Sequence, residues 1–408
     1  MKPIIERFLR YIAIDTTSDD AHGDVTPSTK SQFQLARVLR DDLKEIGVPE
    51  VYLDEEHAYV YAKIPATGKK GEKAPKIGFL AHMDTSPDLP GPCKNPQFID
   101  YEGGSIQLNE EVSMSPEEFP HLKNYVGQRL IVTDGHSLLG ADDKAGLAAC
   151  VEILRHYLES GEEHGQISFC ACPDEEIGHG AALLDLERFD ADFAYTIDGG
   201  AVGSMEYETF NAASAVVKFQ GKSVHPGSAK NIMKNAAELA FQFHALLPAA
   251  QKPEHTEGYE GFYMLSSVEG GIEHACLKYI VRDHDRQKFE AKKQFLKDTL
   301  AYFNKVHGNC TDLELKDQYY NMKEKLEPVM EVVELLKAAI ENTGLTPLIE
   351  PVRGGTDGAQ LSWRGLPCPN FFTGGENFHG RYEFIPESAP EKAAQVGIEI
   401  IRLAAEKV

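Results

Sequence analysis

At 408 residues the chain is longer than one hydrophobic core usually spans, so at least two domains are expected. Its apolar content of 42% is ordinary for a globular protein, and no apolar run approaches the ~20 residues that a membrane span requires. With 41 Lys and Arg against 64 Asp and Glu, the net charge of −23 argues against nucleic acid and membrane surfaces as partners.

Two further features of composition concern the cellular compartment. Charged residues interrupt the first ten positions, so no continuous apolar segment of a signal peptide is present, and a cytoplasmic location is expected. Seven cysteines, an odd number, argue against a disulfide framework. Cys170 and Cys172 have no matching Cys/His pair, so we interpret them as buried strand residues rather than metal ligands.

Along most of the chain, helical and strand patterns alternate, which is typical of an α/β sheet layered between helices. The fold class expected is therefore α/β, with a three-layer α/β/α domain. Helices are predicted over residues 4–12, 31–46 and 143–158, and short strands over 51–53, 59–64, 77–80, 167–172, 194–197 and 370–372.

The pattern changes between about residues 211 and 321. A β-α-β-β-α-β order there predicts a ferredoxin-like α+β unit, inserted into a first domain made of residues 1–210 and 322–408. Its predicted elements are strands 215–219, 262–268 and 275–282, helices 229–247 and 286–306, and a last β run near Leu313.

The first candidate chemical motif, His82-Met83-Asp84, follows directly after an apolar strand. The side chains of His82 and Asp84 share one face of a strand, and ligands in open α/β sheets gather at the carboxyl ends of strands. The motif is short, and a His at a strand end is often only hydrogen-bonded.

Two adjacent acids, Asp142 and Asp143, stand where a helix is predicted to begin. One of them could cap the helix, because carboxylates accept hydrogen bonds from its first N–H groups. Since Gly140 and Gly146 frame the pair and allow close backbone approach, we expect Asp142 to point elsewhere.

Three consecutive acids, Asp174-Glu175-Glu176, follow another apolar strand. Such crowding is unfavourable without cations, and it raises the pKa of one carboxyl into a range suited to proton transfer. A solvated turn is the alternative. Asp198 likewise follows an apolar strand, and His379 lies in a glycine-rich loop; taken singly, either could be structural.

The motifs combine two His with several strand-end or loop carboxylates. Two His and three carboxylates form a ligand set suited to zinc, and one shared carboxylate gives each of two ions three protein ligands. A bridging water is then the nucleophile, and an unliganded Glu takes its proton and passes it to the leaving amine.

These motifs, including Gly140-Ala141-Asp142-Asp143-Lys144 and Asp198-Gly199-Gly200, resemble the co-catalytic dizinc peptidase family of carboxypeptidase G and aminoacylase. The resemblance covers essentially the whole chain and is closest to the tripeptide aminopeptidases of that family. It also rests on residues 211–214, 224–227, 257–262, 319–322 and 353–361.

The resemblance implies a ligand for each position of a dizinc site. His82 and Asp198 bind one zinc, Glu176 and His379 bind the other, and Asp142 bridges the two. The sequence itself leaves the metal open, because cobalt and manganese suit similar ligands.

The resemblance also implies roles around the metals. Asp84 orients His82, Glu175 is the general base, and the inserted unit is a lid that pairs two subunits, with His225 directed to the substrate carbonyl. An Arg fork suits the substrate's terminal carboxylate. Arg353 is the first candidate and Arg282 the second, and either could instead form a structural ion pair.

The function expected is removal of the N-terminal residue from tripeptides by a zinc aminopeptidase, in a homodimer. A related dizinc dipeptidase or N-acyl amino acid hydrolase remains an alternative, because fold and ligands do not fix the substrate. A non-catalytic, metal-stabilised binding protein is a third interpretation, but it leaves the crowding of Glu175 against Glu176 unexplained.

Overall fold

The computed structural model of the protein describes residues 1–407. It divides into two compact units, which are described separately below. The first unit comprises Met1–Tyr207, Glu324–Glu350 and the residues from Thr356 onward, and the second comprises Glu208–Lys323 and Pro351–Gly355.

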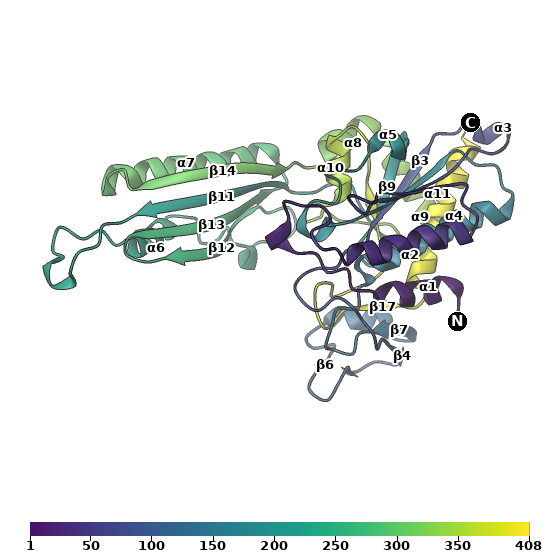
Figure 1. The fold of residues 1–408 in the computed structure, drawn as a ribbon, viewed down its shortest axis with the longest axis horizontal. Helices are drawn as coiled ribbons and strands as arrows, with labels where there is room; N and C mark the ends of the chain where they lie inside the picture. The colour runs from purple at the N-terminus through teal and green to yellow at the C-terminus, as the bar shows by residue number, and fades with distance from the viewer. Residues whose placement is uncertain (408) are drawn as a thin grey trace. The chain divides into compact units, whose positions relative to one another are not determined.

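The first unit contains an eight-stranded mixed sheet, in which Figure 1 labels β3 and β9. Its central strands β8, β3, β9 and β16 are parallel. Antiparallel strands β2 and β1 extend the sheet on one side of this parallel core. In spatial order the strands are β1 (Glu50–Leu53), β2 (Val60–Ile64), β8 (Ile167–Cys172), β3 (Ile77–His82), β9 (Phe193–Ile197), β16 (Asn370–Phe371), β10 (Ser204–Glu206) and β15 (Leu348–Ile349).

Helices cover both faces of this sheet, which explains why β3 and β8 are buried along their whole lengths. Leu80 packs in a cluster with Phe189 of α5 and Leu361 of α10. On the opposite face, Gly397 of α11 lies against Ile153 of α4 and Phe79 of β3. The helices are α1 (Pro3–Ile12), α2 (Gln32–Glu45), α3 (Gly68–Gly71), α4 (Ala141–Ser160), α5 (Leu186–Phe189), α8 (Lys323–Leu326), α9 (Glu331–Asn342), α10 (Asp357–Trp363) and α11 (Ala389–Glu406).

Two small sheets, which the sequence did not predict, belong to the same unit. The first joins β4 (Gln97–Tyr101), β7 (Gln128–Val132) and β17 (Phe384–Pro386), and the second joins β5 (Ile106–Gln107) and β6 (Ser113–Met114). These strands are two to five residues long, too short for a clear alternating pattern. The antiparallel pairing of β17 with β7 brings the C-terminal segment beside the chain that leads into α4.

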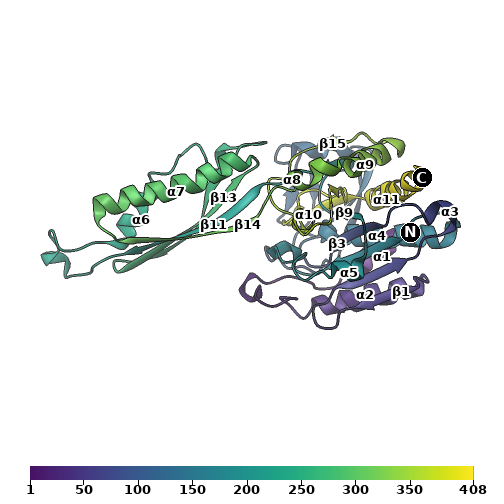
Figure 2. The same cartoon turned by 90° about the horizontal axis from the view of Figure 1, so that it is seen from above.

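The second unit has the β-α-β-β-α-β order and the antiparallel sheet β12-β13-β11-β14 of a ferredoxin-like fold. Both helices pack on the same face of that sheet (Figure 2). Its elements are β11 (Asn211–Gln220), α6 (Ala236–His244), β12 (Phe262–Gly270), β13 (His274–Asp283), α7 (Arg286–His307) and β14 (Thr311–Tyr319).

One predicted helix in this unit was wrong at its start. The helix expected from residue 229 begins as α6 at Ala236, because Lys222 and Lys234 exchange backbone hydrogen bonds of 2.7 and 3.0 Å that hold the preceding segment extended. Asn235 then caps the helix by accepting a hydrogen bond from the Ala237 N–H at 3.1 Å.

The cysteines are free, and Cys170 and Cys172 are buried in β8 as predicted. Within residues 1–407, no helix combines the length and the apolar character needed to cross a membrane.

Candidate active site

The strand-end motifs gather at one edge of the eight-stranded sheet. His82 is the last residue of β3, the acids 174–176 follow β8, and Asp198 follows β9. Because β8, β3 and β9 are parallel neighbours, their carboxyl ends meet at the same edge. Asp142 at the start of α4 and His379 in the loop before β17 face the same place.

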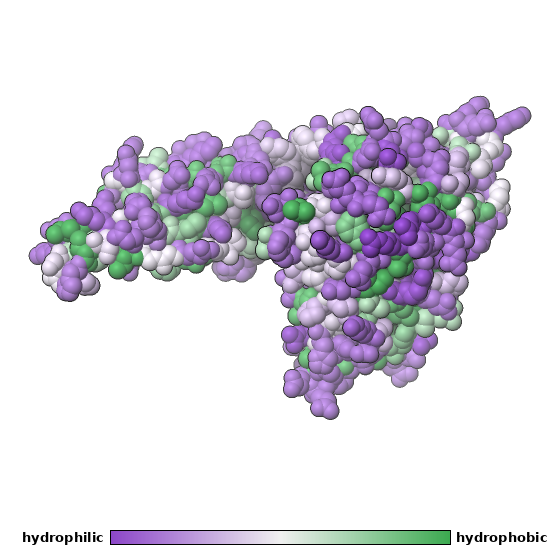
Figure 3. Space-filling model, viewed as in Figure 1, coloured by the Kyte–Doolittle hydropathy of each residue, from purple (hydrophilic) through white to green (hydrophobic). Residues whose placement is uncertain are grey.

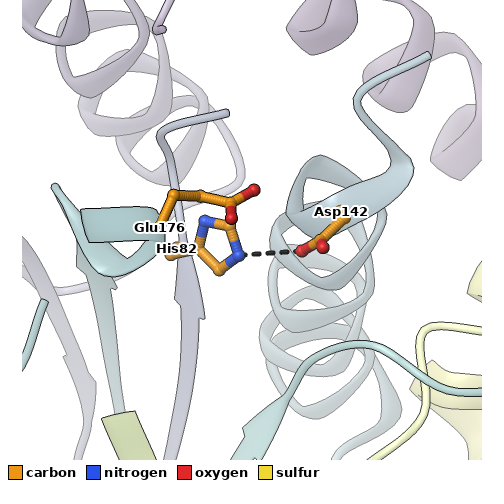
Figure 4. A group of neighbouring side chains, drawn as sticks. All are labelled: His82, Asp142 and Glu176. Atoms are coloured by element: carbon orange, nitrogen blue, oxygen red, sulfur yellow. Dashed lines mark hydrogen bonds and ion pairs between the residues drawn. The ribbon is translucent and has the colours of Figure 1, made fainter. Parts of the chain in front are cut away.

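The Asp142 carboxylate lies between two imidazoles. His82 Nε2 is 2.9 Å from Asp142 Oδ1, and Figure 4 shows these two side chains pointing toward one another. His379 Nε2 is 3.4 Å from the other oxygen, Oδ2. A carboxylate with one oxygen toward each His has the arrangement of a bridging metal ligand.

One further carboxylate accompanies each imidazole. His379 Nε2 lies 2.9 Å from Glu176 Oε2, and His82 Nε2 lies 3.8 Å from Asp198 Oδ1. Donor atoms of His82, Asp142 and Glu176 come within 4.8 Å of one another, and so do those of His82, Glu175 and Asp198. The side chains therefore form two overlapping groups of possible ligands.

Several pKa values in this cluster are raised, which is typical of a site that binds cations. Burial raises the pKa of the Glu176 carboxyl and of the Asp198 carboxyl to about 7. Hydrogen bonds to Asp142 and Glu176 raise the pKa of His379 to about 11. Protons thus compensate the buried acids in the protein alone, and divalent cations would replace them. Two His and several carboxylates fit zinc in donor chemistry.

Asp84 connects the first motif to the acid cluster. It is fully buried, and its Oδ1 lies 3.3 Å from His82 Nδ1. Its two oxygens also accept hydrogen bonds from the backbone N–H groups of Glu175 and Glu176, at 3.0 and 3.1 Å. Asp84 therefore sets both the orientation of the His82 ring and the position of the acidic turn.

The alternative that one acid of the Asp142 and Asp143 pair caps α4 does not hold. No side chain caps that helix from its N-cap residue, and Asp143 Oδ2 instead accepts a hydrogen bond from the His82 backbone N–H at 3.0 Å. Asp142 has extended backbone angles of φ −85° and ψ 105°, outside the helical range. Regular helix begins only beyond these two acids, which leaves Asp142 free to point into the site.

The three consecutive acids differ in their surroundings. Asp174 accepts hydrogen bonds from Ser28 N–H at 2.7 Å and from Gln32 Nε2 at 2.6 Å, so it anchors the turn. Glu175, in contrast, makes no side-chain hydrogen bond among the described residues. Burial raises the pKa of the Glu175 carboxyl well above its usual range. The charge of His82 lowers this pKa and that of Asp198 raises it, but burial has the largest effect. A half-buried carboxyl with a raised pKa and no hydrogen-bond partner among the described residues is suited to carry a proton.

Sequence reasoning missed Glu383, which is buried and lies just before β17. Its carboxylate accepts four backbone N–H groups from the segment that carries Asp142: Leu139 at 2.7 Å, Gly140 at 2.9 Å, Ala141 at 2.7 Å and Asp142 at 3.2 Å. The only signal in the sequence is an acid four residues after His379, ahead of a short apolar run, and this spacing has no obvious meaning without the fold.

Two of the predicted substrate-binding residues, His225 and Arg282, belong to the second unit. His225 is exposed, and its Nδ1 accepts a hydrogen bond from the Gly227 N–H at 3.2 Å, so it shapes the local turn. The Arg282 guanidinium lies over the Tyr319 ring at 5.2 Å, with Nη1 3.1 Å from Gln318 Oε1.

Arg353, also in the second unit, donates hydrogen bonds from its guanidinium to a neighbouring segment. Nη1 donates to the carbonyl oxygens of Gly258 at 2.6 Å and Glu260 at 2.9 Å, and Nη2 donates to Thr256 Oγ1 at 2.9 Å. The group also lies 5.1 Å from the Phe210 ring centre. Arg353 thus holds the segment from residue 256 to residue 260.

Known proteins resemble this chain over nearly its whole length. The profile of peptidase family M20/M25/M40 matches residues 133–406. A protein named Peptidase T from Alkaliphilus oremlandii (strain OhILAs) is 50% identical over 408 residues, which cover 99% of this chain and 99% of that protein.

Solved structures match over the same extent. The crystal structure of aminopeptidase PepT from Bacillus cereus ATCC 10987 matches with a TM-score of 0.77 and 26% identity, covering 98% of each chain. That of a tripeptidase from Staphylococcus aureus subsp. aureus Mu50 matches with a TM-score of 0.78 and 23% identity, covering 99% of this chain and 98% of that one. The predicted α/β/α domain with a ferredoxin-like insertion is therefore the fold of this chain.

Proposed function

The chain belongs to peptidase family M20/M25/M40, and from this membership and its site we propose that it is an aminopeptidase that removes the N-terminal residue of tripeptides. The observation that carries the proposal is the Asp142 carboxylate between His82 and His379, beside the half-buried Glu175, whose side chain has no hydrogen bond among the described residues. The names Peptidase T, aminopeptidase PepT and tripeptidase of its relatives support the substrate class.

Two zinc ions fit the residues of the site. His82 and Asp198 would hold one, Glu176 and His379 would hold the other, and Asp142, which lies between the two imidazoles, would be shared. When bound, zinc polarises a carbonyl group and lowers the pKa of water, which is the chemistry that amide hydrolysis requires.

Glu175 performs the proton transfers. Its carboxylate accepts a proton from the attacking water and then donates it to the nitrogen of the leaving peptide. Its backbone N–H is fixed by Asp84 Oδ1 at 3.0 Å, so the group is held beside the cluster while its side chain remains available. Asp84 also keeps His82 in orientation, because His82 Nδ1 lies 3.1 Å from the Asp84 carbonyl oxygen and 3.3 Å from its carboxylate Oδ1.

Recognition of the substrate's C-terminal carboxylate requires a cation, and an Arg fork provides two parallel hydrogen bonds. Arg353 is the first candidate, and it serves by exchanging some of its bonds to residues 256–260 for the substrate. Arg282 is the second, and His225 contacts the substrate carbonyl. Arg353→Met should raise KM for a tripeptide but not for the same tripeptide with a C-terminal amide. An equal change in KM for both substrates would transfer the role to Arg282, and the corresponding Arg282 variant is tested with the same two substrates.

The second unit serves as a lid and pairs two subunits in a homodimer. We place this domain at residues 211–321, between catalytic segments 1–210 and 322–408. Apolar side chains are exposed on both of its helices, including Phe241 of α6 at 62% and Tyr302 of α7 at 60%, and Figure 3 shows separate apolar patches over this unit. Exposed aromatic side chains of this kind are enriched in protein interfaces. We place the enzyme in the cytoplasm, where it acts in peptide catabolism.

Hydrolysis of a matched peptide set tests the proposal. The substrates are Ala-Ala, Ala-Ala-Ala, Ala-Ala-Ala-Ala and N-acetyl-Ala-Ala-Ala, with zinc-loaded and chelator-stripped protein. Metal-dependent release of Ala from the tripeptide, with resistance of the acetylated form, is expected. Cleavage of the dipeptide alone, or of the acetylated peptide, would instead identify a dipeptidase or an N-acyl amino acid hydrolase. Absence of all turnover by metal-loaded protein would indicate a binding protein.

A further inference from the structure

Glu383 is a buried acid of the first unit whose hydrogen bonds join segments far apart in the chain. Its side chain is 1% exposed, and it joins two segments 241 residues apart, those that carry His379 and Asp142. Each carboxylate oxygen accepts two N–H groups: Oε2 those of Leu139 and Gly140, and Oε1 those of Ala141 and Asp142.

These four donors are consecutive and point to one place, because Gly140 has a left-handed backbone with φ +78°. An uncharged side chain could not replace the acid without loss. The amide of a Gln offers one acceptor oxygen, and its NH₂ group would face two N–H donors that have no other partner. Glu383 therefore fixes the backbone of the turn that ends in Asp142.

The backbone of Glu383 belongs to a loop whose two ends are joined by hydrogen bonds. Glu376 and Phe384 exchange backbone hydrogen bonds of 2.9 and 3.1 Å across the base of this loop, and the Glu383 N–H donates to Gly380 O at 3.2 Å. His379 lies within the loop, so the positions of His379 and Glu383 are fixed together.

We propose that Glu383 is a positioning residue that sets the Asp142 carboxylate relative to His379, and thereby makes Asp142 a ligand that two metal ions can share. The contact that depends on it is the 3.4 Å approach of His379 Nε2 to Asp142 Oδ2. Glu383 does not touch the reacting groups, and its role as part of an active site rests on the function proposed above.

Substitution of a residue that only stabilises the fold should lower Tm without lowering zinc affinity. The first unit offers a matched control in Asp42, a buried carboxylate that accepts hydrogen bonds from Arg10 Nη1 at 3.0 Å, Arg10 Nη2 at 2.7 Å and Tyr11 Oη at 2.7 Å. Asp42 joins α1 to α2, so Asp42→Asn lowers stability without disturbing the turn of Asp142 or the loop of His379.

The test compares Glu383→Gln, Asp42→Asn and the unchanged protein in three measurements: zinc affinity by competition with a chromogenic chelator, Tm, and kcat and KM on Ala-Ala-Ala. Glu383→Gln should bind its weaker zinc about 10–100-fold less tightly, the loss typical of removing a residue that orients metal ligands. Its kcat should fall with little change in KM, and excess zinc should restore part of kcat. Asp42→Asn should lose Tm while retaining zinc affinity and kcat.

Wild-type zinc affinity in folded Glu383→Gln, whatever its Tm, would overturn the proposal. If the Gln variant does not fold, Glu383→Asp decides in its place, because it keeps the charge but its carboxylate is one methylene short of the turn. Zinc affinity lowered in Glu383→Asp supports the role, and unchanged affinity overturns it. Because the zinc measurement needs no substrate, failure of the unchanged protein on tripeptides would refute the proposed function and leave this test intact.

Discussion

The sheet edge that carries the candidate site and the second unit treat buried charge in opposite ways. In the second unit, buried charges are matched by charges of opposite sign, as in Lys292 Nζ with Asp283 Oδ2 at 3.7 Å and Lys293 Nζ with Asp317 Oδ1 at 2.8 Å. In the first unit, several acids converge at one sheet edge on only two imidazoles. A crowd of buried carboxylates is destabilising without further cations.

This difference fits the roles proposed above, chemistry for the first unit and contact between subunits for the second. The raised pKa values of Glu176 and Asp198, both about 7, are a stability cost that ordinary packing does not require. The second unit instead has an apolar core and exposes aromatic side chains on α6 and α7. Substitutions in the two units should therefore affect different measurements.

The largest effect is expected from Glu175→Gln. Because Glu175 is the proposed proton carrier and its carboxyl has no hydrogen bond among the described residues, kcat on tripeptides should fall by about 10²–10⁴-fold, while zinc stoichiometry and Tm stay unchanged. Steady-state kinetics and metal analysis of the same sample measure both. Near wild-type kcat would remove Glu175 from the role of base, and lost zinc would make it a ligand.

Asp84→Asn should have the next largest effect. The substitution removes the charge beside His82 Nδ1 and one acceptor of the acidic turn, so zinc affinity should fall by about 10–100-fold. Asp174→Asn is the control, because Asp174 holds the same turn through Ser28 and Gln32 and should lower Tm rather than zinc affinity. Equal zinc loss in both variants would mean that the turn as a whole, and not Asp84, orients the ligand.

Metal removal should make stability depend on pH. The folded-state pKa values of Glu176 and Asp198, about 7, exceed their usual values near ~4, and that of His379, about 11, exceeds ~6.5. The native state thus binds more protons than the unfolded state, and the Tm of metal-free protein should fall as pH rises from about 5 to about 9. Zinc should restore Tm increasingly over the same range, because it replaces those protons. Thermal unfolding with and without chelator measures this, and a metal-free Tm that rises with pH would contradict it.

The smallest effect on chemistry is expected in the second unit. Phe241→Ser together with Tyr302→Ser should shift sedimentation toward the monomer while changing Tm little, because both side chains are exposed. Leu183→Ser, an exposed apolar position of the first unit at 51%, is the control and should leave association unchanged. A dimer that persists in the double variant would move the interface away from α6 and α7.

Many of the strands and helices could be predicted from local sequence patterns. The strand ending at His82 and the order of the ferredoxin-like unit follow from apolar periodicity and turn residues, which act over a few neighbouring positions. The start of α6 was misjudged because the pairing of Lys222 with Lys234 joins segments 12 residues apart and competes with local helix propensity. The short strands β4, β7 and β17 carry no period long enough to detect.

The sequence by itself therefore determined which residue types stand at strand ends and in glycine-rich loops, and so which chemistry to expect. Only the tertiary structure decided what the second of two adjacent acids does: Asp142 faces the imidazoles, whereas Asp143 binds the backbone of β3. It alone revealed Glu383, whose four partners lie about 240 residues earlier in the chain. Contacts of this range arise from sheet pairing and burial, which no window of sequence contains.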